Sequence, residues 1–113
     1  PVTASGQVEG GMLQALGYAH CEEYAFDNKG RMINDSLGPY KIYRADEMPE
    51  FEVFLIQTME DSGPFGAKAV AEIPKDGVAP ALRNAILHAT GAKINEIPFT
   101  PERVWNKITE IES

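Results

Sequence analysis

A run of turn-forming residues in the second half of the chain constrains the fold more than any other feature. Residues 62–72 read SGPFGAKAVAE. Pro64 fixes its own φ and lacks an N–H group, while Gly63 and Gly66 permit backbone conformations that other residues avoid. This composition predicts an irregular loop in which main-chain N–H groups can come close to a ligand.

A single carboxylate, Glu72, ends this loop after the small apolar residues 69–71. Burial of a carboxyl group favours its protonated form and so raises its pKa toward the range useful for a general base. We therefore expect Glu72 to be partly buried and to accept a proton, although a surface turn with a solvated glutamate has the same pattern. Lys68 does not make the stretch a phosphate-binding loop, because the GxxxxGK[ST] spacing and its hydroxyl are absent.

The composition argues against several classes of partner. The chain has 113 residues, of which 43% are hydrophobic and 24% charged, as in an ordinary globular domain. Its formal net charge of −7 argues against nucleic acid and against an anionic membrane surface, since both require a basic face. No apolar run is long enough to span a bilayer.

The cysteine and histidine content limits metal and redox chemistry. Cys21 is the one cysteine, so the chain forms no internal disulfide and cannot hold an iron–sulfur cluster by itself. No His or Cys pair has the spacing of a zinc site, and we expect no metal ligand among the side chains. A lone thiol suits a reducing compartment, which favours a cytoplasmic location.

Three segments have the pattern of helices. Apolar residues at the helical spacing predict a helix over 8–23. Residues 80–90 form a second candidate, which Gly91 would end. A third helix is expected after Thr100, which can cap it, with Pro101 in its first turn.

Glycines inside the first predicted helix indicate close packing. Gly10, Gly11 and Gly17 each lower the helix propensity by about 1 kcal/mol. Small residues at such sites permit the close approach either of another backbone or of a cofactor, and the sequence leaves both alternatives open.

Three further segments have the pattern of strands. Residues 24–33 resemble a β-hairpin with turn residues at its tip, and residues 51–57 begin with apolar/polar alternation and are rich in β-formers. Residues 94–97 are a candidate for a short strand. The order of elements predicts one α+β domain over residues 1–113, with the helices packed on a short, largely antiparallel sheet.

Several motifs in one order resemble the molybdenum hydroxylases, the xanthine dehydrogenase and aldehyde oxidoreductase family. Residues 6–11 read GQVEGG and are similar to that family's Gly-Gln-x-Glu-Gly-Gly segment, and residues 66–72 are similar to its active-site loop Gly-Ala-Lys-Gly-Val-Gly-Glu. Residues 79–86 and 97–104 resemble its C-terminal run. The resemblance covers nearly the whole chain and implies the C-terminal part of a molybdopterin-binding catalytic subunit, a fragment of a larger domain.

The resemblance also implies an activity and its residues. Glu72 would be the general base in the hydroxylation of an N-heterocycle or aldehyde carbon. Gln7 would lie beside the molybdenum end of molybdopterin. Main-chain contacts and the cofactor wall would come from the loop residues Gly66, Ala67, Lys68, Ala69 and Val70. Iron–sulfur centres and FAD would be held by other segments or subunits, so the partners are the rest of the molybdopterin-binding part, those redox subunits and a small-molecule substrate.

Two residues depart from the family pattern and keep other functions open. Ala71 stands where the family usually has glycine, and Ile73 stands where proline is common. Alanine at a position that requires positive φ would strain the turn, which favours a structural or assembly domain that has lost catalysis. A small-ligand module that reuses the glycine loop is a third alternative. Because the chain starts at Pro1 and enters the first motif at once, we expect a piece of a larger subunit that is inactive alone.

Overall fold

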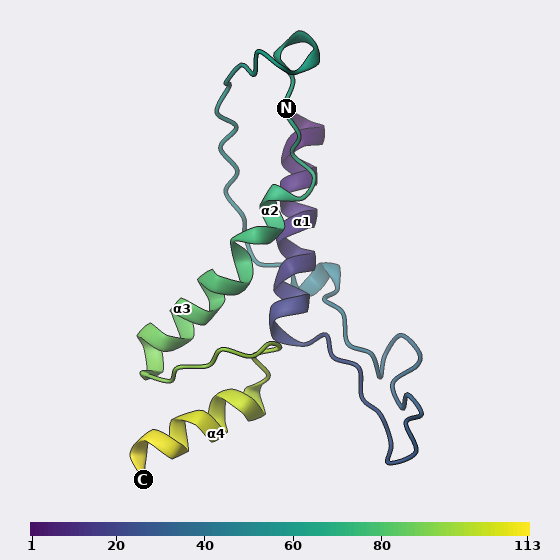
Figure 1. The fold of residues 1–113 in the computed structure, drawn as a ribbon, viewed down its shortest axis with the longest axis vertical. Coiled ribbons are helices and arrows are strands. Elements are labelled where there is room, and N and C mark those ends of the chain that lie inside the picture. The colour runs from purple at the N-terminus through teal and green to yellow at the C-terminus, as the bar shows by residue number, and fades with distance from the viewer.

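Helices account for the regular structure of this chain, and long loops join them (Figure 1). A computed structural model describes all of residues 1–113. In chain order the elements are α1 (Val2–His20), the 3₁₀ turns η1 (Ala45–Glu47) and η2 (Pro64–Gly66), α2 (Ile73–Asp76), α3 (Val78–Thr90) and α4 (Pro101–Glu112). The short helix α2 lies against α1, and α3 continues from it at an angle, still touching α1. None of the helices has the length and hydropathy that a membrane span requires.

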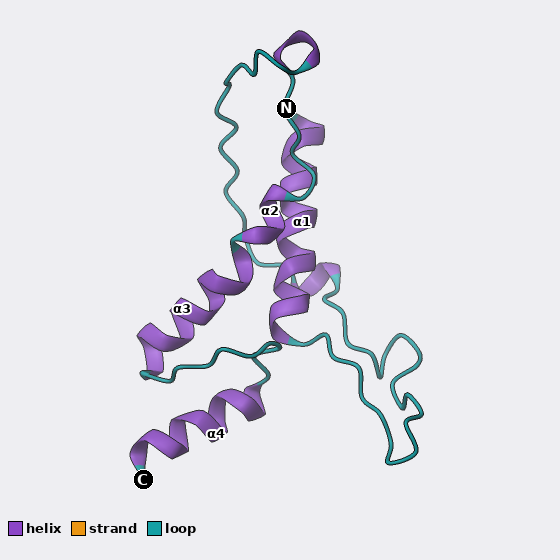
Figure 2. Ribbon diagram, in the orientation of Figure 1, coloured by secondary structure: helices purple, strands orange, loops and turns teal.

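The predicted sheet is absent, so the α+β prediction is wrong. Residues 51–57 and 94–97 form no strand, and Figure 2 shows loop throughout both segments. Two isolated bridges, Phe26 with Met32 and Leu37 with Tyr40, are the only β pairing. A strand requires a neighbour that supplies backbone donors and acceptors, and this chain offers none to either segment.

The turn predicted at the tip of the 24–33 hairpin is present, although the strands around it are not. The Asp27 carboxylate accepts hydrogen bonds from the N–H groups of Lys29 at 2.8 Å and Arg31 at 2.9 Å. The Ile33 N–H donates to the Ala25 carbonyl at 2.9 Å. An Asp side chain that bonds the backbone in this way stabilises a turn locally, without a sheet beside it.

The three predicted helices are confirmed, with shifted ends. The first begins at Val2 rather than at residue 8, and the second begins two residues before Pro80. Gly91 ends α3 in the left-handed region, at φ +75°, and its N–H donates to the Leu87 carbonyl at 2.8 Å. The Thr100 hydroxyl accepts from the Arg103 N–H at 3.3 Å and caps α4. The fourth helix, α2, was not predicted, since it is only one turn long.

A small core joins the end of α1 to the segment before α4. Ala19, Ala92, Ile94 and Phe99 form this buried cluster, and side chains from α3 and α4 pack around it. The Phe99 N–H donates to the Ala19 carbonyl at 2.7 Å. The cluster therefore ties the C-terminal end of α1 to the segment that precedes α4.

Most of the chain is not covered by its own residues. Only 8 of 113 residues are buried, and the accessible surface is 8706 Å², against about 6,100 Å² for a folded monomer of this mass. The radius of gyration is 17.8 Å, against about 13 Å for a compact domain of this length. The chain thus leaves a large apolar surface open.

We expect Phe99→Ala to destabilise the chain by about 3 kcal/mol, because it removes the largest side chain of the buried cluster and leaves a cavity. Urea unfolding followed by helical circular dichroism measures this change. Phe26→Ala is the matched control, since Phe26 is 59% exposed. Equal midpoints for the two variants would contradict the assignment of the core.

Candidate functional site

The glycine loop folds into a tight turn closed by its own backbone. The Gly63 N–H donates to the Glu60 carbonyl at 3.0 Å, and the Glu60 N–H donates to the Gly66 carbonyl at 3.3 Å. A Cβ at Gly63 would lie 2.2 Å from the Ala67 carbonyl oxygen, and Gly66 has φ +77°. Both positions therefore require glycine, as the sequence predicted for this turn.

Phe65, at the tip of this turn, is the only non-glycine residue at positive φ, with φ +55°. Its side chain is fully exposed. Backbone strain of this kind is found preferentially at functional sites, where the surrounding structure holds it in place. The sequence motif contained Phe65, but nothing in the sequence distinguished it from its neighbours.

Beyond the turn, the chain presents a row of free backbone donors. The N–H groups of residues 68–72 donate no hydrogen bond within the chain, and their side chains are exposed. Three of the five side chains are alanine or valine, which leave the backbone open to approach. The Lys68 ammonium turns back to the Thr58 hydroxyl at 3.2 Å. This row can bind a ligand rich in acceptor atoms.

Helix α1 approaches the end of this loop closely at Gly11. A Cβ built on Gly11 would lie 3.2 Å from the Pro74 Cβ and 3.8 Å from the Ala71 carbonyl oxygen. The neighbouring Gly10 has nothing within 4 Å of such a Cβ. Of the two alternatives left open for these glycines, Gly11 serves the close approach of another part of the backbone.

Gln7 lies one helical turn before Gly11, so the two residues share a face of α1. That face is the one against which Ala71 and Pro74 pack. The Gln7 side chain is exposed and forms no hydrogen bond within the chain, so its amide is free to bind a ligand. Because α1 begins at Val2, Gln7 lies inside the helix and does not cap its start.

Glu72 occupies the position just before α2. Its carbonyl accepts from the Lys75 N–H at 2.9 Å, while its carboxylate has no hydrogen-bond or ion-pair partner in the chain. The residue is exposed, so the expected partial burial is not provided by this chain. Ala71 is not at positive φ, and alanine there causes no backbone strain.

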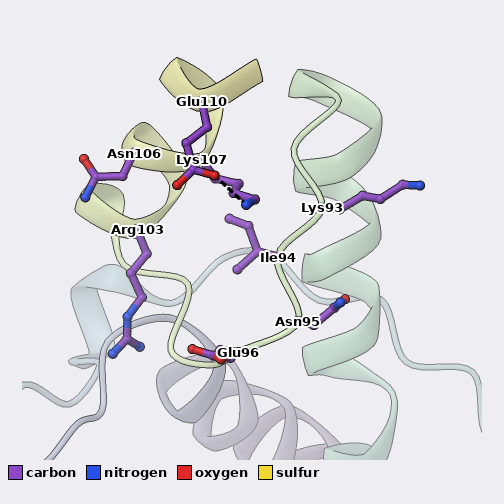
Figure 3. Close-up of a pocket in the computed structure, with 8 residues that line it drawn as sticks. All are labelled: Lys93, Ile94, Asn95, Glu96, Arg103, Asn106, Lys107 and Glu110. Atoms are coloured by element: carbon purple, nitrogen blue, oxygen red, sulfur yellow. Dashed lines mark hydrogen bonds and ion pairs between the residues drawn. The ribbon is translucent and has the colours of Figure 1, made fainter. Parts of the chain in front are cut away.

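A hollow of about 420 Å³ lies between α4 and residues 93–96, away from the glycine loop (Figure 3). None of the predicted site residues lines it. Two of its three basic residues have partners: Lys107 pairs with Glu110, which also lines the hollow, at 2.6 Å, and Arg103 pairs with Glu23 and donates to the Pro98 carbonyl at 2.9 Å.

Comparison with known sequences relates the whole chain to molybdenum proteins. Residues 1–49 match the family model of the molybdopterin cofactor-binding domain. The putative xanthine dehydrogenase molybdenum-binding subunit of Escherichia coli (strain K12) is 37% identical over 108 residues, which cover 95% of this chain and 14% of that subunit. The aldehyde oxidoreductase molybdenum-binding subunit of the same organism is 34% identical over 113 residues, covering 98% of this chain and 15% of that subunit. The chain thus spans only a small part of these relatives.

Solved structures contain the same arrangement as part of longer chains. Quinoline 2-oxidoreductase from Pseudomonas putida 86 matches with a TM-score of 0.87 and 28% identity, over 97% of this chain and 14% of that one. A copper- and molybdenum-containing CO dehydrogenase matches with a TM-score of 0.86 and 28% identity, over 99% of this chain and 14% of that one. The helices and long loops described above therefore occur as a segment within larger proteins.

The turn contains a titratable contact that can be tested directly. The Ser62 hydroxyl, at 2.7 Å, and the Ser62 N–H, at 3.2 Å, donate to the Glu60 carboxylate and lower its pKa. We expect Ser62→Ala to raise the pKa of Glu60 toward its ordinary value of 4.5. NMR titration of the Glu60 side chain measures this shift.

Folding lowers the pKa of Glu60, so the contact stabilises the turn fully when the pH is above the ordinary pKa of a glutamate. This stabilisation is lost as the pH falls through the lowered pKa of the folded state. Ser36→Ala is the control, since the Ser36 hydroxyl forms no hydrogen bond within the chain. An unchanged Glu60 titration in Ser62→Ala would contradict this account of the turn.

Proposed function

Because the chain belongs to the molybdenum hydroxylase family, we propose that it is the C-terminal segment of a molybdopterin-binding subunit that hydroxylates an N-heterocycle or aldehyde carbon. Its role there is to supply the general-base glutamate, Glu72, and part of the cofactor wall. The observation that carries the proposal is the packing of Pro74 and Ala71 against Gly11. This contact joins the loop that ends in Glu72 to the helix face that bears Gln7.

The free donors of this chain fit molybdopterin, a cofactor rich in oxygen and nitrogen acceptors. The backbone N–H groups of Lys68, Ala69 and Val70 have no acceptor in the chain, and the Gln7 amide is unpaired. These groups would bind the cofactor, and Gly66 and Ala67 would form part of the wall of its binding site. When bound, molybdenum-molybdopterin supplies the oxidation–reduction chemistry and the oxygen that is transferred.

Glu72 is placed to act as the proton acceptor of the reaction. Its carboxylate is exposed and unpaired, so no partner within the chain competes for the proton. The contact with α1 at Gly11 involves Ala71 and Pro74, the residues on either side of Glu72 and Ile73, and so keeps this backbone close to the helix that bears Gln7. Remaining parts of the subunit would cover the loop and exclude water.

The complete enzyme requires more than this chain. We propose iron–sulfur and FAD partners on other segments or subunits, a cytoplasmic location, and no activity for the 113 residues alone. Relatives are named for xanthine, hypoxanthine and aldehydes, and one solved relative for quinoline. These names support small heterocycles or aldehydes as the substrate class. The non-catalytic alternative depended on strain at Ala71, and Ala71 has no such strain.

Glu72→Gln in the complete subunit should lower kcat by about 10²–10⁴-fold, because an amide of the same shape cannot accept the proton. Dye-linked hydroxylase assays measure the rate, and metal analysis measures bound molybdenum. We expect the variant to retain its molybdenum.

Glu50→Gln is the matched control, because Glu50 is also exposed and forms no hydrogen bond or ion pair within the chain. It should leave the rate unchanged. Full activity in Glu72→Gln would remove Glu72 from the reaction and return the chain to the non-catalytic alternative.

Gly11→Val should also lower kcat, by about 10²-fold, because its side chain would displace Pro74 and with it the Glu72 carboxylate. The same assay and metal analysis apply. Gly10→Val costs the same helix propensity but meets nothing within 4 Å at its Cβ. Equal loss of activity in both variants would show that helix propensity, rather than the contact with Pro74, accounts for the effect.

A further inference from the structure

Two alanines in the loop before Glu72 stand where the family pattern has glycine. That pattern, Gly-Ala-Lys-Gly-Val-Gly-Glu, has glycine at its fourth and sixth positions, and residues 66–72 have Ala69 and Ala71 there. Each difference adds one methyl group to the loop and leaves its charge and its backbone donors unchanged. The two differences therefore concern the space beside the loop, close to the proposed general base.

Packing within the chain does not account for these methyl groups. Neither alanine is at positive φ, so the backbone accepts alanine and glycine alike at both positions. Ala71 approaches α1 through its carbonyl oxygen, which lies 3.8 Å from a Cβ built on Gly11. The side chains of Ala69 and Ala71 are exposed. Both methyl groups are thus free to contact a ligand.

Both alanines are close to Glu72 along the chain. Consecutive Cα atoms are about 3.8 Å apart, and three residues of extended chain span at most about 11 Å. A general base must also come within hydrogen-bond reach of the proton that it accepts. The atoms around the reacting carbon of a substrate therefore lie near Ala71, and a ring fused to that carbon extends into the space near Ala69.

Backbone and side chain of the two alanines have separate roles in this arrangement. The N–H groups of residues 68–72 donate no hydrogen bond within the chain and are the proposed cofactor donors. A backbone donor does not depend on the side chain of its residue, so a change between glycine and alanine preserves it. The methyl groups instead reduce the space that is left for the substrate.

We propose that Ala69 and Ala71 are specificity-determining residues, whose methyl groups narrow the substrate pocket beside Glu72. The site accepts a flat heterocycle or an unbranched aldehyde, and it discriminates against a substrate with a methyl group next to the reacting carbon. One methyl or methylene group in a pocket changes the relative rate by about 10–200-fold. The inference rests on the proposed function, because it takes Glu72 as the base of a hydroxylation.

Glycine variants of the complete subunit test this selectivity. Two pairs of compounds differ by a methyl group next to the reacting carbon: quinoline and 3-methylquinoline, and propanal and 2-methylpropanal. Wild-type subunit should have the higher kcat/KM for the unmethylated compound of each pair that it turns over. Ala69→Gly and Ala71→Gly should each lower this ratio by about tenfold, through a higher kcat/KM for the methylated compound. Bound molybdenum should stay unchanged.

Ala45→Gly is the matched control, because Ala45 is also exposed and lies in η1, outside the glycine loop. Like the two test variants, it removes the restriction that alanine places on the unfolded chain. It should leave both the ratio and the molybdenum content unchanged. Wild-type selectivity in both Ala69→Gly and Ala71→Gly would overturn the proposal. Altered molybdenum content with an unaltered ratio would overturn it as well, because the methyl groups would then contact the cofactor.

Equilibrium binding of the same compounds separates this proposal from the role of Glu72, because binding does not require turnover. A lower binding ratio in the glycine variants, together with full activity of Glu72→Gln, would keep the narrowed pocket and reject the general base. An unchanged binding ratio, together with an inactive Glu72→Gln, would reject the narrowed pocket and keep the general base.

Discussion

The approach of Pro74 to Gly11 is the contact on which the arrangement of this chain depends. Because Gly11 lacks a side chain, α1 can lie directly against the residues that follow the glycine loop. The same helix bonds through Ala19 to Phe99 at its other end. One rigid helix therefore fixes the loop that ends in Glu72 and the small core relative to each other, although they are far apart in the sequence.

Helices of this chain were predictable because their signals are local. Thr100 and Gly91 act at helix ends through bonds to residues three or four positions away, and these bonds form in the chain by itself. The strand predicted over 51–57 had equally good β-forming residues. A strand forms only beside a neighbour, and no property of residues 51–57 reveals whether the chain contains one.

The candidate site was predictable in its residues but only partly in its geometry. The resemblance to the molybdenum hydroxylases singled out Gln7 and Glu72, and the face shared by Gln7 and Gly11 follows from the helical repeat. The exposure of Glu72 did not follow, since burial depends on surfaces that other parts of a subunit supply. The strained backbone of Phe65 was equally hidden, because positive φ at an aromatic residue is set by the loop as a whole.

The scarcity of buried residues changes how sequence variation in this chain should be interpreted. In most small proteins an exposed side chain is free to vary, and a buried one is not. Here Phe54, Ile56 and Phe65 are among the most exposed side chains, in a chain that spans about 14% of its relatives, so the rest of a longer protein has access to them. Solvent exposure measured on this segment alone therefore underestimates the selective constraint on its residues.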